Sequence, residues 1–138
     1  MKTEHYHYGS KKHKLVILPG KIFGPLGKQN ISLVFDPGSY RTILSAELTD
    51  FLGYQATTQS KKISTTSVTG KEYGYTLLIS QLNILGFEFR NIEIACFDLP
   101  EKYEIDGLLG LDLLEKFEVT LQHKDRWIEF RLLDSAEN

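Results

Sequence analysis

The sequence predicts a mostly β domain that carries two short helices. Most of the chain consists of short runs rich in β-branched and aromatic residues, and these runs are separated by Gly, Pro or polar turn residues. Two segments combine an apolar face with the signals that begin or end a helix. The length of 138 residues suits one domain with a core of ordinary size.

The composition excludes several classes of protein. Hydrophobic residues make up 41% and charged residues 25%, a balance typical of soluble globular proteins. The formal net charge of −2 provides no general attraction to nucleic acid or anionic membranes, so neither is expected as a partner. No apolar stretch approaches the roughly 18 residues that span a bilayer. The first residues include Glu4 and no apolar signal region, so we expect a cytoplasmic location.

The two ends of the chain are expected to be tails around a domain spanning residues 14–133. Residues 1–13 are polar, rich in His, Tyr and Lys, and without a period, which predicts a loose N-terminal tail. Three histidines there, His5, His7 and His13, could hold a metal ion, but nothing fixes their geometry and a solvated arm is the simpler interpretation. Residues 134–138 are expected to form a C-terminal tail.

The first half of the domain reads as two strands and a helix. Leu15–Leu18 is a short apolar run closed by Pro19-Gly20, and a Gly- and Pro-rich turn follows over residues 24–30. The strand Ile31–Phe35 then ends at an acid, Asp36. Ser45–Leu52 is predicted to be a helix, with Ser45 as its N-cap and an acid in the first turn, where the helix dipole favours one.

Residues 63–97 are predicted to form strands. The polar segment Thr69-Gly70-Lys71-Glu72 is a hairpin tip between two β-rich runs, and Gly86 marks a second turn. In the following run the apolar residues change parity around Arg90-Asn91, which predicts a bulge or a bend.

The last third begins with "DGLLGLDLLEKF". Asp106-Gly107 reads as a turn, Leu108-Leu109 as a buried strand fragment, and Gly110 as a point of close backbone approach. A short helix is predicted over Leu111–Phe117 and a hairpin over the remaining residues. The acids Asp112, Glu115 and Glu118 are most simply a solvated face.

Asp36 is the residue with the clearest chemical significance. A carboxylate at the end of an apolar strand is costly to desolvate, so it needs a structural or a chemical reason. It could belong to a turn, cap a helix or take part in catalysis. Two segments considered together favour catalysis, because the strand-borne "DPGS" is followed later by "LLG" leading directly into a helix.

With these two segments the sequence resembles the retropepsin-like aspartic peptidases, in particular the bacterial single-domain members. The first family signature is matched by Leu33-Val34-Phe35-Asp36-x-Gly38-Ser39, and its continuation into "RTILS" and a short helix is similar too. The second signature, Asp-Gly-Leu-Leu-Gly followed by a helix, is matched by Asp106 to Gly110. The resemblance covers roughly residues 14–133 and implies an acid-protease half-barrel.

The resemblance also implies a mechanism. Each chain supplies one catalytic residue, Asp36, so the active site forms only in a homodimer. The two carboxyls share a proton and titrate as a unit, and the pair activates water against a peptide bond in a peptide or unfolded protein. Gly38 lets the backbone approach the pair, and Ser39 could donate to a carboxylate oxygen. No metal or organic cofactor is implied.

Further positions take roles from the same resemblance. Residues 69–72 (Thr69, Gly70, Lys71, Glu72) fall where family members carry the flap that closes over substrate. Leu109 and Gly110 are expected to pack beneath the loop that bears Asp36.

Pro37 departs from the family pattern, which has Thr or Ser at this position. The family's hydroxyl and backbone N–H join a hydrogen-bonded grip between the two loops, and proline supplies neither group. Proline instead fixes its own φ and biases Asp36 toward an extended backbone. Two functions therefore stay open: an active aspartic endopeptidase, and a catalytically degenerate domain that serves peptide binding or assembly.

Other candidate residues have simpler explanations. Cys96 lies in an alternating strand and reads as a small core residue rather than a nucleophile. Ser39 and His123 could be assembled into a hydrolase triad, but no oxyanion loop accompanies them. Tyr73 and Tyr75 beside the hairpin tip are usually packing residues, although one could cover a bound peptide.

Overall fold

The computed structural model describes residues 2–9, 14–67, 70–100 and 104–133 of the chain, and they form a mostly β fold, as the sequence predicts. The strands are β1 (Thr3–His7), β2 (Ile17–Gly24), β3 (Gly27–Phe35), β4 (Ile43–Ser45), β5 (Lys62–Ser67), β6 (Gly70–Ile84), β7 (Phe87–Phe97), β8 (Gly107–Leu109), β9 (Phe117–Gln122) and β10 (Trp127–Leu132). The helices are α1 (Ala46–Phe51) and α2 (Leu111–Leu114). No helix in this part of the chain is long and apolar enough to cross a membrane.

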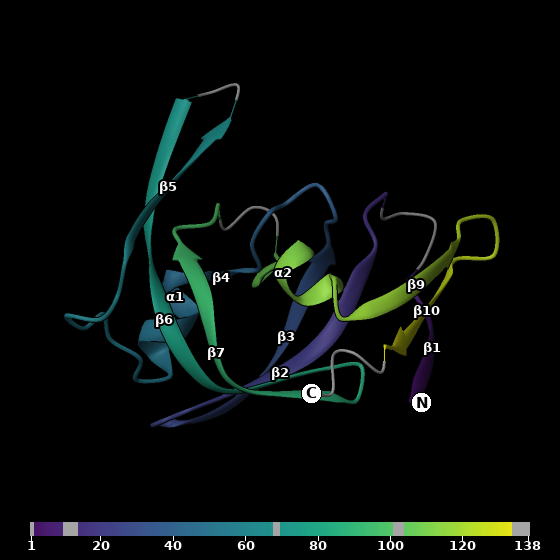
Figure 1. Ribbon diagram of the computed structural model, residues 1–138, viewed down its shortest axis with the longest axis horizontal. Helices are drawn as coiled ribbons and strands as arrows, with labels where there is room; N and C mark the ends of the chain where they lie inside the picture. Colours follow the sequence, from purple (N-terminus) through teal and green to yellow (C-terminus); the bar gives the residue numbers. More distant parts are fainter. Residues whose placement is uncertain (1, 10–13, 68–69, 101–103, 134–138) are drawn as a thin grey trace.

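Six strands close into a barrel. Their hydrogen-bonded order is β2-β3-β8-β4-β7-β6, and an additional pairing of β2 with β6 closes the ring. β5 pairs with the first part of β6, outside the barrel. The β5–β6 hairpin therefore projects from the body of the molecule (Figure 1). The barrel core consists of fully buried aliphatic side chains: Leu18, Ile22, Leu33, Leu44, Ile79, Leu82 and Ile94.

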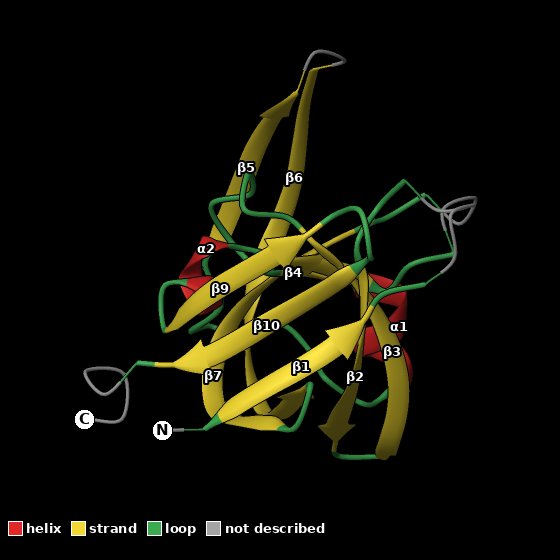
Figure 2. Ribbon diagram, turned by 90° about the vertical axis from the view of Figure 1, so that its right-hand side faces the viewer, coloured by secondary structure: helices red, strands yellow, loops and turns green. Residues whose placement is uncertain are grey.

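A three-stranded sheet of order β1-β10-β9 packs beside the barrel (Figure 2). Aromatic rings join the two sheets: Phe117 of β9 lies edge-on to Phe87 of β7, with ring centroids 4.8 Å apart, and Phe130 of β10 lies edge-on to Phe35 of β3, at 6.1 Å. Phe35 immediately precedes Asp36, so this sheet supports the end of the strand that presents the acid.

The expectation of a loose tail over residues 1–13 is wrong for Thr3–His7, which pairs with β10 over its whole length. The physical reason is an alternation in the sequence, since Tyr6 and Tyr8 point inward while His5 and His7 are exposed. Tyr8 is only 2% exposed and bonds His123 Nδ1 at 3.2 Å. Tyr6 within β1 and Tyr8 directly after it make the apolar face of this segment.

Pro19-Gly20 does not close a strand, because β2 continues through both residues to Gly24. The pairing of β2 with β6 begins at Gly20, one residue after the proline, so the missing N–H of Pro19 is not needed by β6. A side chain at Gly20 would meet the backbone oxygen of Asn83 at 2.8 Å. Gly20, directly after Pro19, therefore allows β2 and β6 to pair at close range.

Both predicted helices are present, and one is shorter than expected. Ser45 caps α1 by accepting a hydrogen bond from the N–H of Leu48 at 3.4 Å. α2 ends at Leu114, before its predicted end at Phe117. Phe117 instead begins β9, where its ring packs edge-on against Phe87 and Phe130.

The β6–β7 hairpin bends without a bulge. Ile79 pairs with Ile92 and Gln81 with Arg90, so the register is the same on both sides and no residue is inserted. Asn91 has a φ of 52°, in the left-handed region that Asn tolerates better than most residues. The backbone conformation at Asn91 shifts the inward-facing side chains of β7 from odd-numbered residues before it to even-numbered residues after it.

Candidate active site

Asp36 lies at the carboxyl end of β3, on the loop of residues 36–42, which we call the Asp36 loop. Its backbone N–H donates to the carbonyl of Leu109 at 3.0 Å, so β8 holds the loop at its first residue. The N–H of Gly38 donates to Asp36 Oδ1 at 3.1 Å, and the N–H of Ser39 donates to the Asp36 carbonyl at 3.0 Å. The carboxyl is half-buried, and its position is set by the turn that follows it.

Gly110 lies directly against the Asp36 loop. A Cβ at this position would collide with the backbone of Arg41 and would meet the backbone nitrogen of Thr42 at 2.8 Å. The next residue, Leu111, donates its N–H to the carbonyl of Ser39 at 2.9 Å. The "LLG" segment and the acid-bearing loop are therefore in backbone contact, and only glycine fits between them.

A buried hydroxyl and a carboxylate tie the far end of the loop to α2. Thr42 is fully buried, and its Oγ1 accepts the N–H of Gly110 at 3.0 Å. The same hydroxyl donates to Asp112 Oδ1 at 2.6 Å, and the Thr42 N–H donates to that oxygen at 2.9 Å. The N–H of Leu113 also donates to Asp112 Oδ1, at 2.8 Å. The expectation that Asp112 belongs to a solvated face is therefore wrong, because its carboxylate is part of a hydrogen-bonded network.

Pro37 and Ser39 do not make the contacts that the resemblance implies for these positions. Pro37 is exposed at the outer turn of the loop and has no N–H to donate. Ser39 Oγ donates to the carbonyl of Arg41 at 2.7 Å, not to the carboxylate of Asp36. Within one chain the loop is thus held by backbone bonds and by Thr42 and Asp112.

The candidate flap is the β5–β6 hairpin. Its residues Gly70, Lys71 and Glu72 are exposed at the start of β6, whereas Thr69 lies outside the described residues. Gly70 has a φ of 127°, which suits the close of the hairpin. Tyr73 is 74% exposed on the same strand, and Tyr75 is half-buried, with burial as the main cause that raises its pKa.

Two hollows adjoin the Asp36 loop. One, of about 390 Å³, is lined by Asp36 together with apolar side chains that include Leu15, Val34 and Leu108. The other, of about 130 Å³, lies between the loop and β5. The carboxyl of Asp36 therefore borders an apolar hollow, and hollows of this kind receive the apolar groups of ligands.

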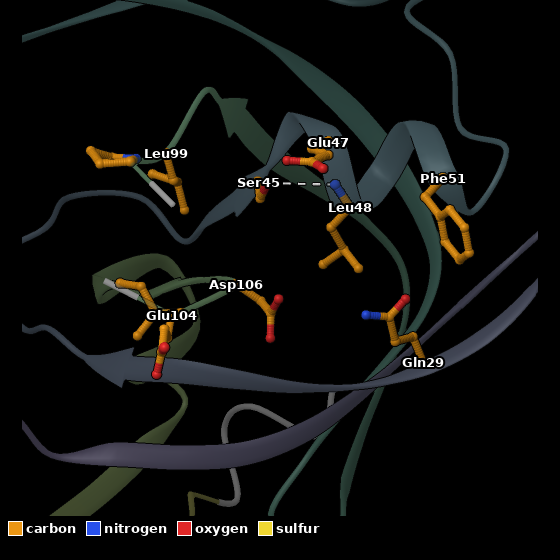
Figure 3. A pocket seen from close by; sticks show the side chains of 10 residues that line it. Gln29, Ser45, Glu47, Leu48, Phe51, Leu99, Glu104 and Asp106 are labelled. Carbon is orange, nitrogen blue, oxygen red and sulfur yellow. Dashed lines mark hydrogen bonds between the residues drawn. The ribbon is translucent and has the colours of Figure 1, made fainter. Parts of the chain in front are cut away.

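A larger hollow of about 530 Å³ lies between α1, β3 and the segment before β8 (Figure 3). Glu47, Glu104 and Asp106 contribute carboxylates to its wall. Asp106 is already engaged there, since its Oδ2 accepts the N–H of Ser32 at 2.8 Å and its carbonyl accepts the N–H of Ser45 at 2.8 Å. Those bonds make Asp106 a structural residue that fixes β8 between β3 and β4.

The remaining candidate residues have no place beside Asp36. Cys96 is fully buried, and burial raises the pKa of its thiol to about 12, so it is not a nucleophile. His5 and His7 stack on the exposed face of β1, and His13 lies outside the described residues. In the described ranges no group of three or more His, Cys, Asp or Glu side chains is arranged to hold a metal ion.

Sequence reasoning missed the network of Thr42 and Asp112. One signal was available in the sequence. Asp112 lies in the first turn of a very short helix, and such a helix needs contacts from other segments to be stable. Its partner lies 70 residues earlier in the chain, and no local pattern identifies such a partner.

Comparison with known proteins identifies relatives of this arrangement. A family model described as "Aspartyl protease" matches residues 18–113. Among solved structures, the chain is similar to the crystal structure of a retropepsin-like aspartic protease from Rickettsia conorii, with a TM-score of 0.65 and 19% sequence identity over 94% of this chain and 98% of that one. No curated protein matches the sequence. The prediction of a retropepsin-like fold is confirmed.

Proposed function

Because this chain belongs to the aspartyl protease family, we propose that it is a homodimeric aspartic endopeptidase whose active site contains Asp36 from each of two chains. The observation that carries the proposal is the placement of Asp36. Its carboxyl is fixed by the N–H of Gly38, borders an apolar hollow, and lies on a loop held from beneath by β8.

The dimer is needed because one chain presents one such carboxyl. Apolar side chains surround it at the surface: Tyr40 is 79% exposed, Leu15 is 50% exposed and Leu111 is 37% exposed. Leu15 lines the hollow next to Asp36, and Leu111 bonds the Asp36 loop through its backbone. A two-fold axis through this face buries these side chains and brings the two Asp36 carboxyls together.

The chemistry follows from that pairing. Two carboxyls within hydrogen-bond reach cannot both ionise cheaply, so the pair holds one proton. The ionised member takes a proton from water as the water oxygen attacks the peptide carbonyl carbon, and the protonated member donates its proton to the substrate. The carboxyl that took the water proton then donates it to the nitrogen, the C–N bond breaks, and the other carboxylate regains a proton from a hydroxyl of the tetrahedral species, which leaves a free amine and a carboxylic acid.

A second function, peptide binding or assembly without catalysis, is favoured by Pro37. This residue removes the hydroxyl and the N–H with which related loops grip one another, at about 1 kcal/mol for each bond lost. Against this, the loop has its own supports in Thr42 and Asp112, and proline stiffens the turn.

The decisive experiment measures hydrolysis of an unfolded protein and of a broad peptide library between about pH 3 and 8, the range in which a coupled carboxyl pair ionises. We expect activity that peaks in acid and falls on both sides, and its loss in Asp36→Asn with fold and dimer retained. Metal chelators and thiol reagents are expected to leave the rate unchanged.

Pro37→Thr separates the two functions, because it restores both missing groups. An active enzyme changes modestly, whereas a degenerate one gains hydrolysis that the natural protein lacks. Absence of cleavage by the natural protein and by Pro37→Thr would leave peptide binding as the function.

A further inference from the structure

We infer that the hollow between the Asp36 loop and β5 selects an acidic side chain of the bound peptide, and that Arg41 is the residue that determines this preference. The inference rests on the proposed function, since it assigns a substrate class to the same site. The hollow is called the Arg41 pocket below. Its lining includes Tyr40, Arg41 and Ile43 from the loop and its continuation, Ile63 and Thr65 from β5, and Phe97 at the end of β7.

The position of the Arg41 pocket makes it part of a peptide-binding cleft. One wall is the loop that carries Asp36, and the opposite wall is β5 of the candidate flap. A peptide held between the flap and the acid therefore passes its entrance. The volume of about 130 Å³ corresponds to about four water molecules, which is room for one small side chain.

The charge in the Arg41 pocket is uncompensated. Among its described lining residues, Arg41 alone is charged, and the others are apolar or carry hydroxyl groups. Arg41 is half-buried, and no ion pair or side-chain hydrogen bond links it to any residue in the described ranges. A half-buried arginine without a partner of its own gains most from a carboxylate, which its guanidinium can bind with two parallel hydrogen bonds.

The remaining lining residues favour the same ligand. Ser64 and Thr65 bring hydroxyl groups from β5 that can donate to a carboxylate oxygen. Ile43, Ile63 and Phe97 provide apolar contacts for the methylene groups of the ligand and lower the local dielectric, which strengthens the charge pair. The side chains of glutamate and aspartate have both a carboxylate for the polar donors and methylene groups for the apolar contacts.

Binding tests this inference without relying on turnover. Peptides of about eight residues are compared in pairs that carry Glu or Gln at one position, with each position scanned in turn, and their affinities for Asp36→Asn are measured by fluorescence anisotropy. We expect one position at which the Glu peptide binds about tenfold tighter or more, which is the effect of a charge-assisted hydrogen bond.

Substitutions then identify the responsible residue. Arg41→Gln, in the Asp36→Asn background, should abolish the difference between the Glu and Gln peptides, and Arg41→Glu should reverse it in favour of a Lys peptide. Lys62→Gln is the matched control, because it removes one positive charge from β5 at a residue that lines a different hollow. That variant should keep the preference.

The outcomes separate this inference from the proposed function. Equal affinity for Glu and Gln peptides at every position, no peptide binding at all, or the same loss in Lys62→Gln as in Arg41→Gln overturns the inference. Charge-selective binding without hydrolysis by the natural protein upholds it while removing the endopeptidase.

Discussion

At the scale of single residues, the network of Thr42 and Asp112 explains how the Asp36 loop is held although it contains Pro37. One carboxylate oxygen accepts hydrogen bonds from the Thr42 N–H, the Thr42 hydroxyl and the Leu113 N–H. The hydroxyl in turn accepts the N–H of Gly110. These bonds lie within one chain, so they stiffen the loop before any dimer forms, which a grip between two chains cannot do.

Asp112→Ala should lower the free energy of unfolding by about 1–3 kcal/mol, because the donors of buried Thr42 lose their acceptor. Urea unfolding at a fixed protomer concentration measures this effect. Glu115→Ala, an exposed acid just beyond the same helix, should stay within about 0.5 kcal/mol of the natural protein. Equal effects of the two substitutions would contradict a role for the network.

Cys96 provides a second prediction at this scale. Burial is the main cause that raises the pKa of its thiol from 9.0 to about 12, with the Thr49 hydrogen bond opposing the rise. Below about pH 9 the thiol is protonated in both the folded and the unfolded chain, so its contribution is complete. Above that pH the unfolded chain loses the proton first, and the contribution declines until the pH reaches about 12.

The stability of the natural protein relative to Cys96→Ala should therefore fall by about 1.4 kcal/mol between pH 8 and pH 10. Any constant cost of the cavity left by the substitution cancels in this comparison. Denaturant unfolding at the two pH values measures it, and a difference that does not change with pH would show that the thiol ionises normally in the folded chain.

At the scale of elements, the sequence predicts those strands and helices whose signals are local. α1 was predicted from its cap, and β8 from its apolar residues and flanking glycines. β1 was missed because its apolar face consists of tyrosines between histidines, and this alternation looks polar. Asp36 and Gly110 were identified as a pair from motifs, whereas Asp112 and the Arg41 pocket depend on contacts between distant segments.

The β5–β6 hairpin should be the part of the candidate site that opens most readily. β5 pairs with β6 alone, and the hairpin stands away from the barrel (Figure 1). Hydrogen exchange at Lys71 and Glu72 should be much faster than at Leu108 and Leu109, because few buried contacts anchor the hairpin. Leu82 is an internal control, since the same strand there pairs with β2 and β7. Equally slow exchange at all these amides would contradict a flap.

At the scale of the whole molecule, the barrel and the β1-β10-β9 sheet place the Asp36 loop on a surface rimmed by exposed apolar residues. A contiguous apolar patch on a natural protein often marks a surface that a partner covers. Tyr40 and Leu111 belong to the loop and to the helix beneath it, so the proposed dimer would cover the surface that carries the acid. Dimerisation and catalysis should therefore be lost together.

Tyr40→Glu tests this coupling, because it places a charge in the proposed interface and leaves the Asp36 carboxyl in place. Tyr40 also lines the Arg41 pocket, so the dimer fraction is measured directly and not inferred from hydrolysis. Sedimentation velocity should show the natural protein as a dimer and Tyr40→Glu as a monomer, and hydrolysis should fall with the dimer fraction. Phe51→Glu is the matched control, since Phe51 is a similarly exposed aromatic residue, 72% exposed against 79% for Tyr40, on α1. It should keep both dimer and activity, because Phe51 lines neither of the two hollows that adjoin the Asp36 loop. The specific activity of the natural protein should also fall on dilution below the dissociation constant of the dimer. Full activity of a monomeric Tyr40→Glu would mean that one Asp36 suffices, and it would remove the reason for a two-chain active site.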